Sequence, residues 1–158
     1  MNKINTKTIA RIAAVQALYQ YISNHQEQKA EELISAIAHY YKDNEINNDL
    51  GIASKSKTKI KLNVSYFTNI VTFAIKDQEA IDQIITDHLS DGWKWEHLHT
   101  TLVALLRASI CELIYFPEVP FKVIINEFTD IASDMLKESE VAFVNSMLDK
   151  VSKELKRA

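Results

Sequence analysis

The sequence is poor in the residues that make cross-links and tight turns. Its 158 residues include one cysteine, two glycines and two prolines. The single cysteine, Cys111, excludes an intrachain disulfide and a paired-cysteine metal site. Two glycines and two prolines are too few for a many-stranded sandwich or barrel with tight hairpins, and no phosphate-binding glycine loop is present. The composition therefore favours helices.

Long apolar runs are also missing. The most apolar stretch, residues 101–116, is interrupted by Arg107 and Glu112, so no segment predicts a membrane span. The N-terminus lacks the apolar core and cleavage site of a secretory signal, and we expect a cytoplasmic protein with no membrane partner. With 47% apolar and 25% charged residues, the chain should fold, as one domain over residues 1–158.

An overall positive charge is absent, since the formal net charge is −3, but the cations are unevenly placed. Lys3, Lys7 and Arg11 lie in a segment without an acid, and residues 55–61 hold four lysines, again without an acid. The first group forms either a solvated helix face or a phosphate-contacting patch. In the second case Gln16 would add an amide, and Tyr19, unless it lies in the core, a ring on which an unpaired base stacks.

Apolar residues recur at spacings of three and four along most of the chain, which predicts an all-α fold. A polar loop is expected at about 42–58, where this periodicity lapses. The predicted helices are 6–22 or 8–22, 28–41, 63–89 with a bend near 76–78, 98–116, 120–135 and 139–155.

Recognisable catalytic patterns are absent: there is no nucleophile elbow, no HExxH and no paired-cysteine zinc signature. His97 and His99 are two residues apart, so on a helix they point to different sides and suit one metal poorly. We expect no enzymatic activity, no metal and no cofactor.

Charged residues inside the most apolar helix need partners, because an unpaired buried charge is costly. We expect Arg107 and Glu112 to be paired with Asn126 and Glu127 in a structural network between two helices. Asn145 and Asp149, one turn apart on the last predicted helix, are also interpreted as structural. Their sequence spacing allows this but does not identify the partners.

Four motifs occur in one order along the chain: ARIAAVQALYQ at 10–20, LLRASICEL at 105–113, VPFKVIINE at 119–127 and FVNSMLDK at 143–150. Together they resemble the NusB family of bacterial transcription antitermination factors. The resemblance implies two packed helical bundles, with the N-terminal helix against the C-terminal bundle. It also implies a non-catalytic factor that pairs with the ribosomal protein NusE and binds boxA RNA of ribosomal RNA leaders. The pair would join the RNA polymerase antitermination complex and suppress Rho-dependent termination.

The resemblance also assigns residues. Lys7 and Arg11 match cationic family positions, Tyr19 matches the tyrosine of the ALY motif, and Phe143 matches an aromatic near that surface or in the core. The family's usual cluster of N-terminal arginines is reduced here, and we hypothesise that the lysines of residues 55–61 compensate. The family-signature positions interpreted as structural are Arg107, Glu112, Asn126, Glu127, Asn145 and Asp149.

An alternative interpretation is that the protein binds other proteins and not a specific RNA sequence. It would then be a helical interaction module, or a homodimer that hides its basic face. The steep salt dependence of phosphate contacts distinguishes RNA binding from apolar helix packing. A NusB-like domain also precedes the catalytic domain of a ribosomal RNA cytosine methyltransferase. The length of 158 residues predicts that no such enzymatic domain follows here.

Overall fold

The computed structural model describes residues 6–43, 61–90 and 92–155, and within these ranges all regular structure is helical. The predicted loop at about 42–58, with Lys55 and Lys57, falls almost wholly outside the described residues, as do Lys59 and Lys3. The helices are α1 (Thr6–Ser23), α2 (Ala30–Asp43), α3 (Val64–Lys76), α4 (Gln78–Asp87), α5 (Thr100–Tyr115), α6 (Phe121–Met135) and α7 (Glu138–Leu155), with a short 3-10 turn, η1 (Trp95–His97).

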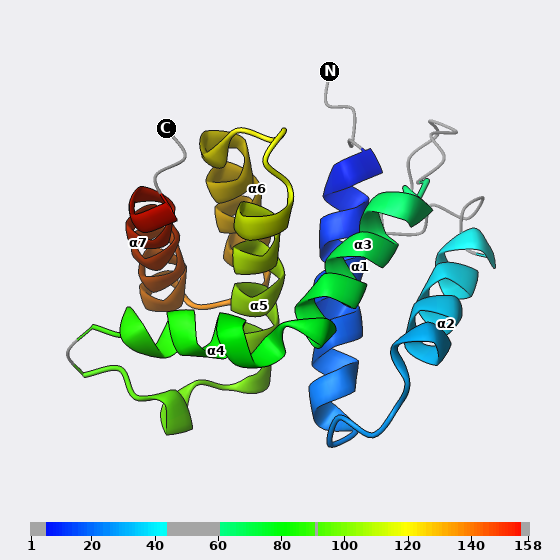
Figure 1. The fold of residues 1–158 in the computed structure, drawn as a ribbon, viewed down its shortest axis with the longest axis horizontal. Helices are drawn as coiled ribbons and strands as arrows, with labels where there is room; N and C mark the ends of the chain where they lie inside the picture. The colour runs from blue at the N-terminus through cyan, green and yellow to red at the C-terminus, as the bar shows by residue number, and fades with distance from the viewer. Residues whose placement is uncertain (1–5, 44–60, 91, 156–158) are drawn as a thin grey trace.

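The helices form two groups, α1–α3 and α4–α7, which pack side by side (Figure 1). Helix α5 is buried along nearly its whole length and contacts α1, α3, α4, α6 and α7. Helix α1 packs on α5 from one side and on α3 from another, so it joins the two groups. The predicted all-α fold of two packed bundles, with the N-terminal helix against the C-terminal one, is confirmed.

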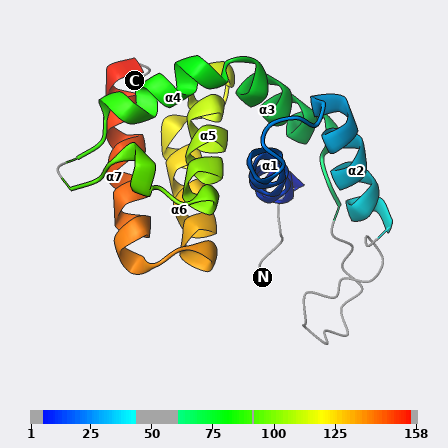
Figure 2. The same ribbon diagram turned by 90° about the horizontal axis from the view of Figure 1, so that it is seen from below.

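Helix α1 can lie between two neighbours because small side chains line it. Ala10, Ala13, Ala14 and Ala17 are fully buried, and alanine lets neighbouring helices approach closely. Seen along its axis, α1 has α3, α2 and α5 around it, and among the described helices none covers the remaining side (Figure 2).

The helix ends follow local chemistry. The Asn63 side chain accepts a hydrogen bond from the Tyr66 amide (3.0 Å) and begins α3, and the expected bend occurs at Asp77, between α3 and α4. Gly92 has a φ of +88°, which suits glycine, and it follows α4, which ends with His88 as its C-cap.

Candidate functional site

A buried ionic cluster ties α1 to three other helices. The Arg11 guanidinium donates to both carboxylate oxygens of Glu112 on α5 (Nη2–Oε2 2.6 Å, Nε–Oε1 2.8 Å) and to Glu127 on α6 (3.1 Å). Tyr66 on α3 donates its hydroxyl hydrogen to Glu112 and accepts from Arg11 Nη2 (3.3 Å). Thr8, one turn before Arg11, donates to Glu127 (2.6 Å). One guanidinium therefore connects both helix groups.

The charges in this cluster stabilise one another. Burial alone would lower the pKa of Arg11, but the hydrogen bond and the charge of Glu112 outweigh it and raise that pKa. Burial, together with Glu112, raises the pKa of Tyr66, so the phenol stays protonated and remains a donor. Arg11 is thus a permanent cation whose charge is compensated inside the protein.

This cluster corrects two expectations. The Arg11 side chain is 2% exposed, so its predicted place on a solvent-facing flank is wrong. The physical reason is Glu112, which is fully buried and needs a cation; Arg11 supplies it in place of Arg107. Glu112 and Glu127 do share a network, but Arg11 on the N-terminal helix joins them, and none of the expected pairings of Arg107 and Glu112 with Asn126 and Glu127 occurs.

Arg107 belongs to a separate pair. Its guanidinium donates twice to Asp82 on α4, with both distances 2.8 Å, and Gln26 accepts a longer bond (3.4 Å). The prediction that Arg107 pairs with Asn126 or Glu127 is therefore wrong, and Asn126 lies exposed on α6. Arg107 faces α4, and no spacing in the sequence indicates that Asp82 of that helix is its partner.

The remaining predicted residues of the C-terminal bundle have local roles. Phe143 is buried and stacks on Trp93, with ring centroids 4.1 Å apart, so its core alternative is the observed one. Exposed Asn145 accepts a hydrogen bond from Thr129 on α6 (3.3 Å), and Asp149 pairs with Lys153 one turn on (3.1 Å). These contacts fit the structural interpretation of positions 145 and 149.

The other α1 residues predicted to contact RNA lie on different sides of the helix. The Lys7 ammonium lies 5.2 Å from the centre of the Tyr66 ring, on the α3 side. Gln16 follows nine residues later, about two and a half turns, so it leaves the helix on the opposite side. Gln16 accepts a hydrogen bond from the Tyr41 hydroxyl of α2 (2.7 Å), and Tyr19 is 45% exposed. Lys7 therefore lies on a different side of α1 from Gln16, and the residues predicted to contact RNA do not form one continuous patch.

Tyr19 and Gln16 border an open hollow of about 500 Å³. Its wall combines apolar side chains, including Met135 at the end of α6, with the amides of Gln16 and Gln20 and the hydroxyl of Thr101. The exposed ring of Tyr19 leaves one aromatic face available beside this space. An aromatic ring next to amide groups suits a flat, hydrogen-bonding ligand such as an unpaired base.

Within the described residues no group of three or more His, Cys, Asp or Glu side chains is placed to hold a metal ion. His99 instead caps α5 by accepting from the Leu102 amide (3.4 Å), and its Nε2 lies 2.8 Å from Glu140. Cys111 is buried with its thiol against the Ile70 carbonyl oxygen (3.5 Å), and burial raises its pKa. It stays a protonated core thiol.

Some contributors were not singled out in the sequence. Tyr66, Thr8 and Asp82 complete the two ionic sites, and Tyr41 positions Gln16. The contact of Thr8 with the Arg11 cluster could have been predicted, because Thr8 lies about one turn before Arg11 on the same helix. The others come from helices distant in sequence, and no local pattern marks them. None of the described helices has the length and apolarity to cross a membrane.

Comparison with known proteins identifies the family of the chain. The NusB family model matches residues 8–153. The chain belongs to the NusB family. A protein of Rickettsia bellii (strain OSU 85-389) named transcription antitermination protein NusB is 44% identical over 156 residues, covering 99% of this chain and 96% of its own. The protein of the same name in Rickettsia rickettsii (strain Sheila Smith) is 44% identical over 153 residues, covering 97% and 95%.

Solved NusB structures share the fold. Thermotoga maritima NusB superposes with a TM-score of 0.70 at 23% identity, covering 97% of this chain and 94% of its own. A crystal structure of antitermination factors NusB and NusE in complex with double-stranded RNA matches with a TM-score of 0.71 at 22% identity, covering 96% and 99%. The family resemblance and the fold class predicted from the four motifs are both confirmed.

Proposed function

We propose that this chain is a non-catalytic transcription antitermination factor of the cytoplasm. It pairs with NusE, and the pair binds boxA RNA of ribosomal RNA leaders within the RNA polymerase antitermination complex, suppressing Rho-dependent termination. The name and coverage of the Rickettsia relatives support this function. The shared fold of the NusB–NusE–RNA structure supports NusE and RNA as the partners.

The observation that carries the RNA-binding part is the open hollow bordered by Gln16 and Tyr19 of α1. There the half-exposed Tyr19 ring borders the 500 Å³ hollow, and Gln16 is held in place by Tyr41. Sequence-specific RNA recognition commonly takes unstacked bases onto aromatic rings and reads their edges with amides. Tyr19 supplies the stacking surface and Gln16 the hydrogen-bonding group.

Phosphate contacts complete this proposal. Lys7 lies at the start of α1, about 18 Å along the helix axis from Tyr19 and on a different side of the helix, so a strand that contacts both would pass partly around α1. Lys3 precedes it in sequence and adds a second cation. Arg11 is not among the proposed contacts, because its charge is used by Glu112 and Glu127. Its role is to hold α1, and with it Tyr19, in place.

The alternative is a protein-interaction module or homodimer that uses the same side of α1. The exposed apolar parts of Tyr19 and Met135 favour it. The two functions differ in their response to salt: neutralised phosphates make log affinity fall linearly with log salt, whereas buried apolar contacts are nearly insensitive.

The test is binding of a boxA-containing leader RNA and a scrambled control, with and without NusE, by fluorescence anisotropy at low and physiological salt. Preference for boxA that sharpens when NusE is added is the expected result. Equal, weak binding to both RNAs, together with a salt-insensitive self-association, would move the function to protein interaction.

A further inference from the structure

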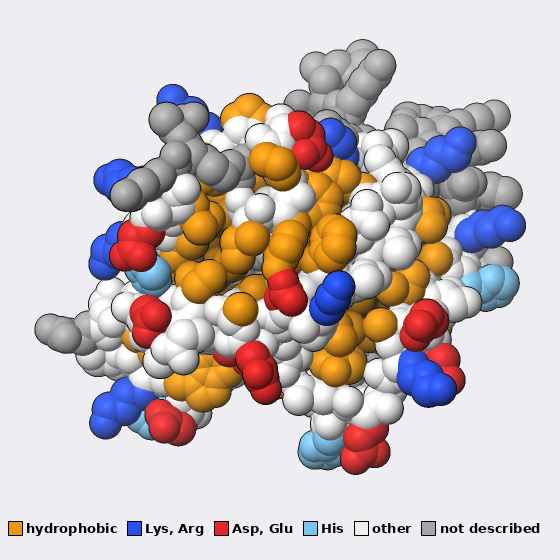
Figure 3. Space-filling model, in the orientation of Figure 1, with side chains coloured by type: hydrophobic (Ala, Val, Ile, Leu, Met, Phe, Trp, Pro, Cys, Tyr) orange, Lys and Arg blue, Asp and Glu red, His pale blue; other side chains and the backbone are white. Residues whose placement is uncertain are grey.

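The described residues that line the Tyr19 hollow are all uncharged, whereas charged side chains of both signs are interspersed over the face of the molecule that Figure 3 shows. Contacts to phosphates carry no sequence information, because the phosphate is the same at every nucleotide. An uncharged lining distinguishes bases through neutral donors and acceptors at the base edges. The atoms that the amides of this hollow leave free therefore decide which bases fit it.

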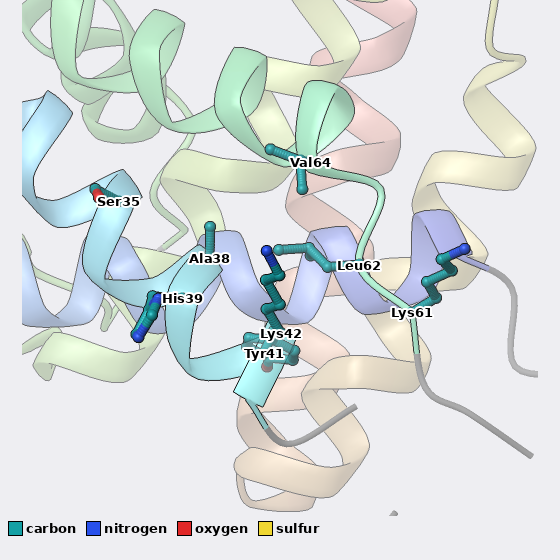
Figure 4. Close-up of a pocket in the computed structure, with 8 residues that line it drawn as sticks. All are labelled: Ser35, Ala38, His39, Tyr41, Lys42, Lys61, Leu62 and Val64. Carbon is teal, nitrogen blue, oxygen red and sulfur yellow. The ribbon is translucent and has the colours of Figure 1, made fainter. Parts of the chain in front are cut away.

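The orientation of one of these amides is set by a residue of another helix. The Tyr41 hydroxyl donates its hydrogen to the Oε1 atom of Gln16 (2.7 Å). Tyr41 lies in the last turn of α2, which passes in front of α1 in the view of Figure 4. Its ring packs partly buried against the core and meets the ring of Tyr40 edge-on, with centroids 5.5 Å apart. The packing of the ring thus sets the position of the hydroxyl.

Tyr41 is the donor in this pair. Burial and the neighbouring Tyr40 raise the pKa of Tyr41 to about 12, so the phenol keeps its hydrogen at neutral pH. Gln16 places its oxygen, not its nitrogen, against the hydroxyl. The amide is therefore the acceptor.

This contact leaves the NH2 group of Gln16 for a ligand. An amide is planar, with its oxygen and nitrogen on opposite sides, so an oxygen turned to Tyr41 turns the nitrogen away from it. Among the described residues this NH2 group has no hydrogen-bond acceptor. Gln16 is exposed and lines the Tyr19 hollow, so a base in the hollow meets an amide that offers donors.

The free atoms of this amide suit some bases and not others. A glutamine that is free to turn reads adenine with two bonds, donating to N7 and accepting from the N6 amino group. With its oxygen turned to Tyr41, Gln16 can only donate to the base. Uracil and guanine present a keto oxygen, O4 or O6, where cytosine and adenine carry an amino group. An amino group facing the NH2 of Gln16 would leave two donors opposed and unpaired.

We infer that Tyr41 is a positioning residue that makes the Tyr19 hollow selective for bases with a keto oxygen, uracil and guanine, over adenine and cytosine. It acts through Gln16, whose NH2 group it turns towards the base. The inference rests on the proposed function and extends it from RNA binding to the choice of base.

The test compares Y41F, which removes only the hydroxyl that holds Gln16, with the matched control Y40F, which removes the hydroxyl of the exposed neighbouring ring. Binding of oligo(U) and oligo(A) of about ten nucleotides is measured by fluorescence anisotropy with NusE present. The ratio of the oligo(U) to the oligo(A) affinity should fall about fivefold or more in Y41F and stay unchanged in Y40F. Stacking within oligo(A) is the same for every variant, so a change in this ratio reports the protein.

Two further variants show whether Tyr41 acts through Gln16. In a Q16A background, adding Y41F should leave the ratio unchanged, because the amide that Tyr41 orients is gone. Q16E replaces the donors by acceptors and should shift the ratio towards oligo(A). A ratio that is unchanged in Y41F, even where both affinities fall together, overturns the inference, and so does an equal effect of Y41F with and without Gln16.

The outcomes also separate this inference from the proposed function. If the unmodified protein prefers boxA to scrambled RNA and Y41F keeps the ratio, the proposed function stands and the positioning role is wrong. If boxA and scrambled RNA bind equally while Y41F still lowers the ratio, the positioning role is supported and the boxA assignment fails. Absence of RNA binding would overturn both.

Discussion

Arg11 and Glu112 are 101 positions apart in sequence, yet they form a two-pronged ion pair in the core (Nη2–Oε2 2.6 Å, Nε–Oε1 2.8 Å). The pair fastens α1 to α5, and Tyr66 adds α3 to the same contact. Since the exposed side of α1 carries the proposed base site, the orientation of that site depends on a buried charge and not on surface residues.

Replacing Arg11 by methionine should therefore destabilise the fold. R11M leaves the carboxylate of Glu112 buried without its cation, and such a loss costs about 3–5 kcal/mol in the free energy of unfolding. Urea denaturation followed by circular dichroism measures it. K7M, which removes a half-buried cation one turn earlier, serves as the control and should cost clearly less.

The double variant R11M/E112L tests the cause. Removing both charges eliminates the unpaired carboxylate, so the double variant should be more stable than R11M alone. Additive destabilisation by the two changes would show that packing, and not charge compensation, makes Arg11 important.

The limits of sequence reasoning are visible at these same residues. The need of Glu112 for a partner could be predicted, because it lies in a nearly all-apolar helix. The identity of that partner could not. Helix α1 is buried on more than one side, by α3 and α5, so its apolar residues form no single stripe, and their periodicity does not indicate that Arg11 turns inward.

Tertiary contacts decided the other differences too. Arg107 could be recognised as a charge in need of an acid, but Asp82 reaches it only because α4 crosses α5. Helix positions and the bend at Asp77 followed from spacing and capping residues, which act within one or two turns. Pairs of residues distant in sequence depend on how the helices pack against one another, and no short sequence pattern indicates that packing.

Removal of the exposed ring at position 19 should weaken RNA binding without unfolding the protein. Base stacking on an aromatic side chain contributes about 1–3 kcal/mol per base, so Y19A should lose that much binding free energy for boxA RNA. Y19F keeps the ring and should retain most of the affinity. Fluorescence anisotropy with NusE present measures both.

Tyr40 provides the matched control for Tyr19. It is 59% exposed on α2, and it does not line the hollow beside Tyr19. Y40A should bind boxA RNA like the unmodified protein. Equal losses in Y19A and Y40A would remove Tyr19 from the proposed base site.

Substitutions of Lys7 and Arg11 should have different effects, although both residues were predicted to contact RNA: one should change RNA binding and the other the stability of the fold. K7Q removes a proposed phosphate contact, so the slope of log affinity against log salt should become shallower by about 0.7 for single-stranded RNA. Its free energy of unfolding should change far less than that of R11M. If K7Q leaves the salt slope as it was, Lys7 does not contact a phosphate of the RNA.

The pH dependence of stability should have a contribution from Glu140 at the start of α7. Burial would raise its pKa, but the backbone N–H of Lys137 (3.1 Å) and the imidazole of His99 (2.8 Å) hold the carboxylate and lower that pKa. A lowered folded-state pKa means that the ionised form stabilises the protein above the unfolded-state value of about 4.3. The contribution is lost as the pH falls through the folded-state pKa.

The variant E140Q isolates this contribution. At neutral pH it should be less stable by about 0.5–1 kcal/mol, because an anion near a helix N-terminus is lost, and the difference should shrink as the pH is lowered below about 4. Urea denaturation at several pH values measures it, with E138Q, an exposed acid of the same helix turn, as control. A difference between E140Q and the unmodified protein that stays constant down to pH 3 would show that the negative charge of Glu140 does not contribute to stability.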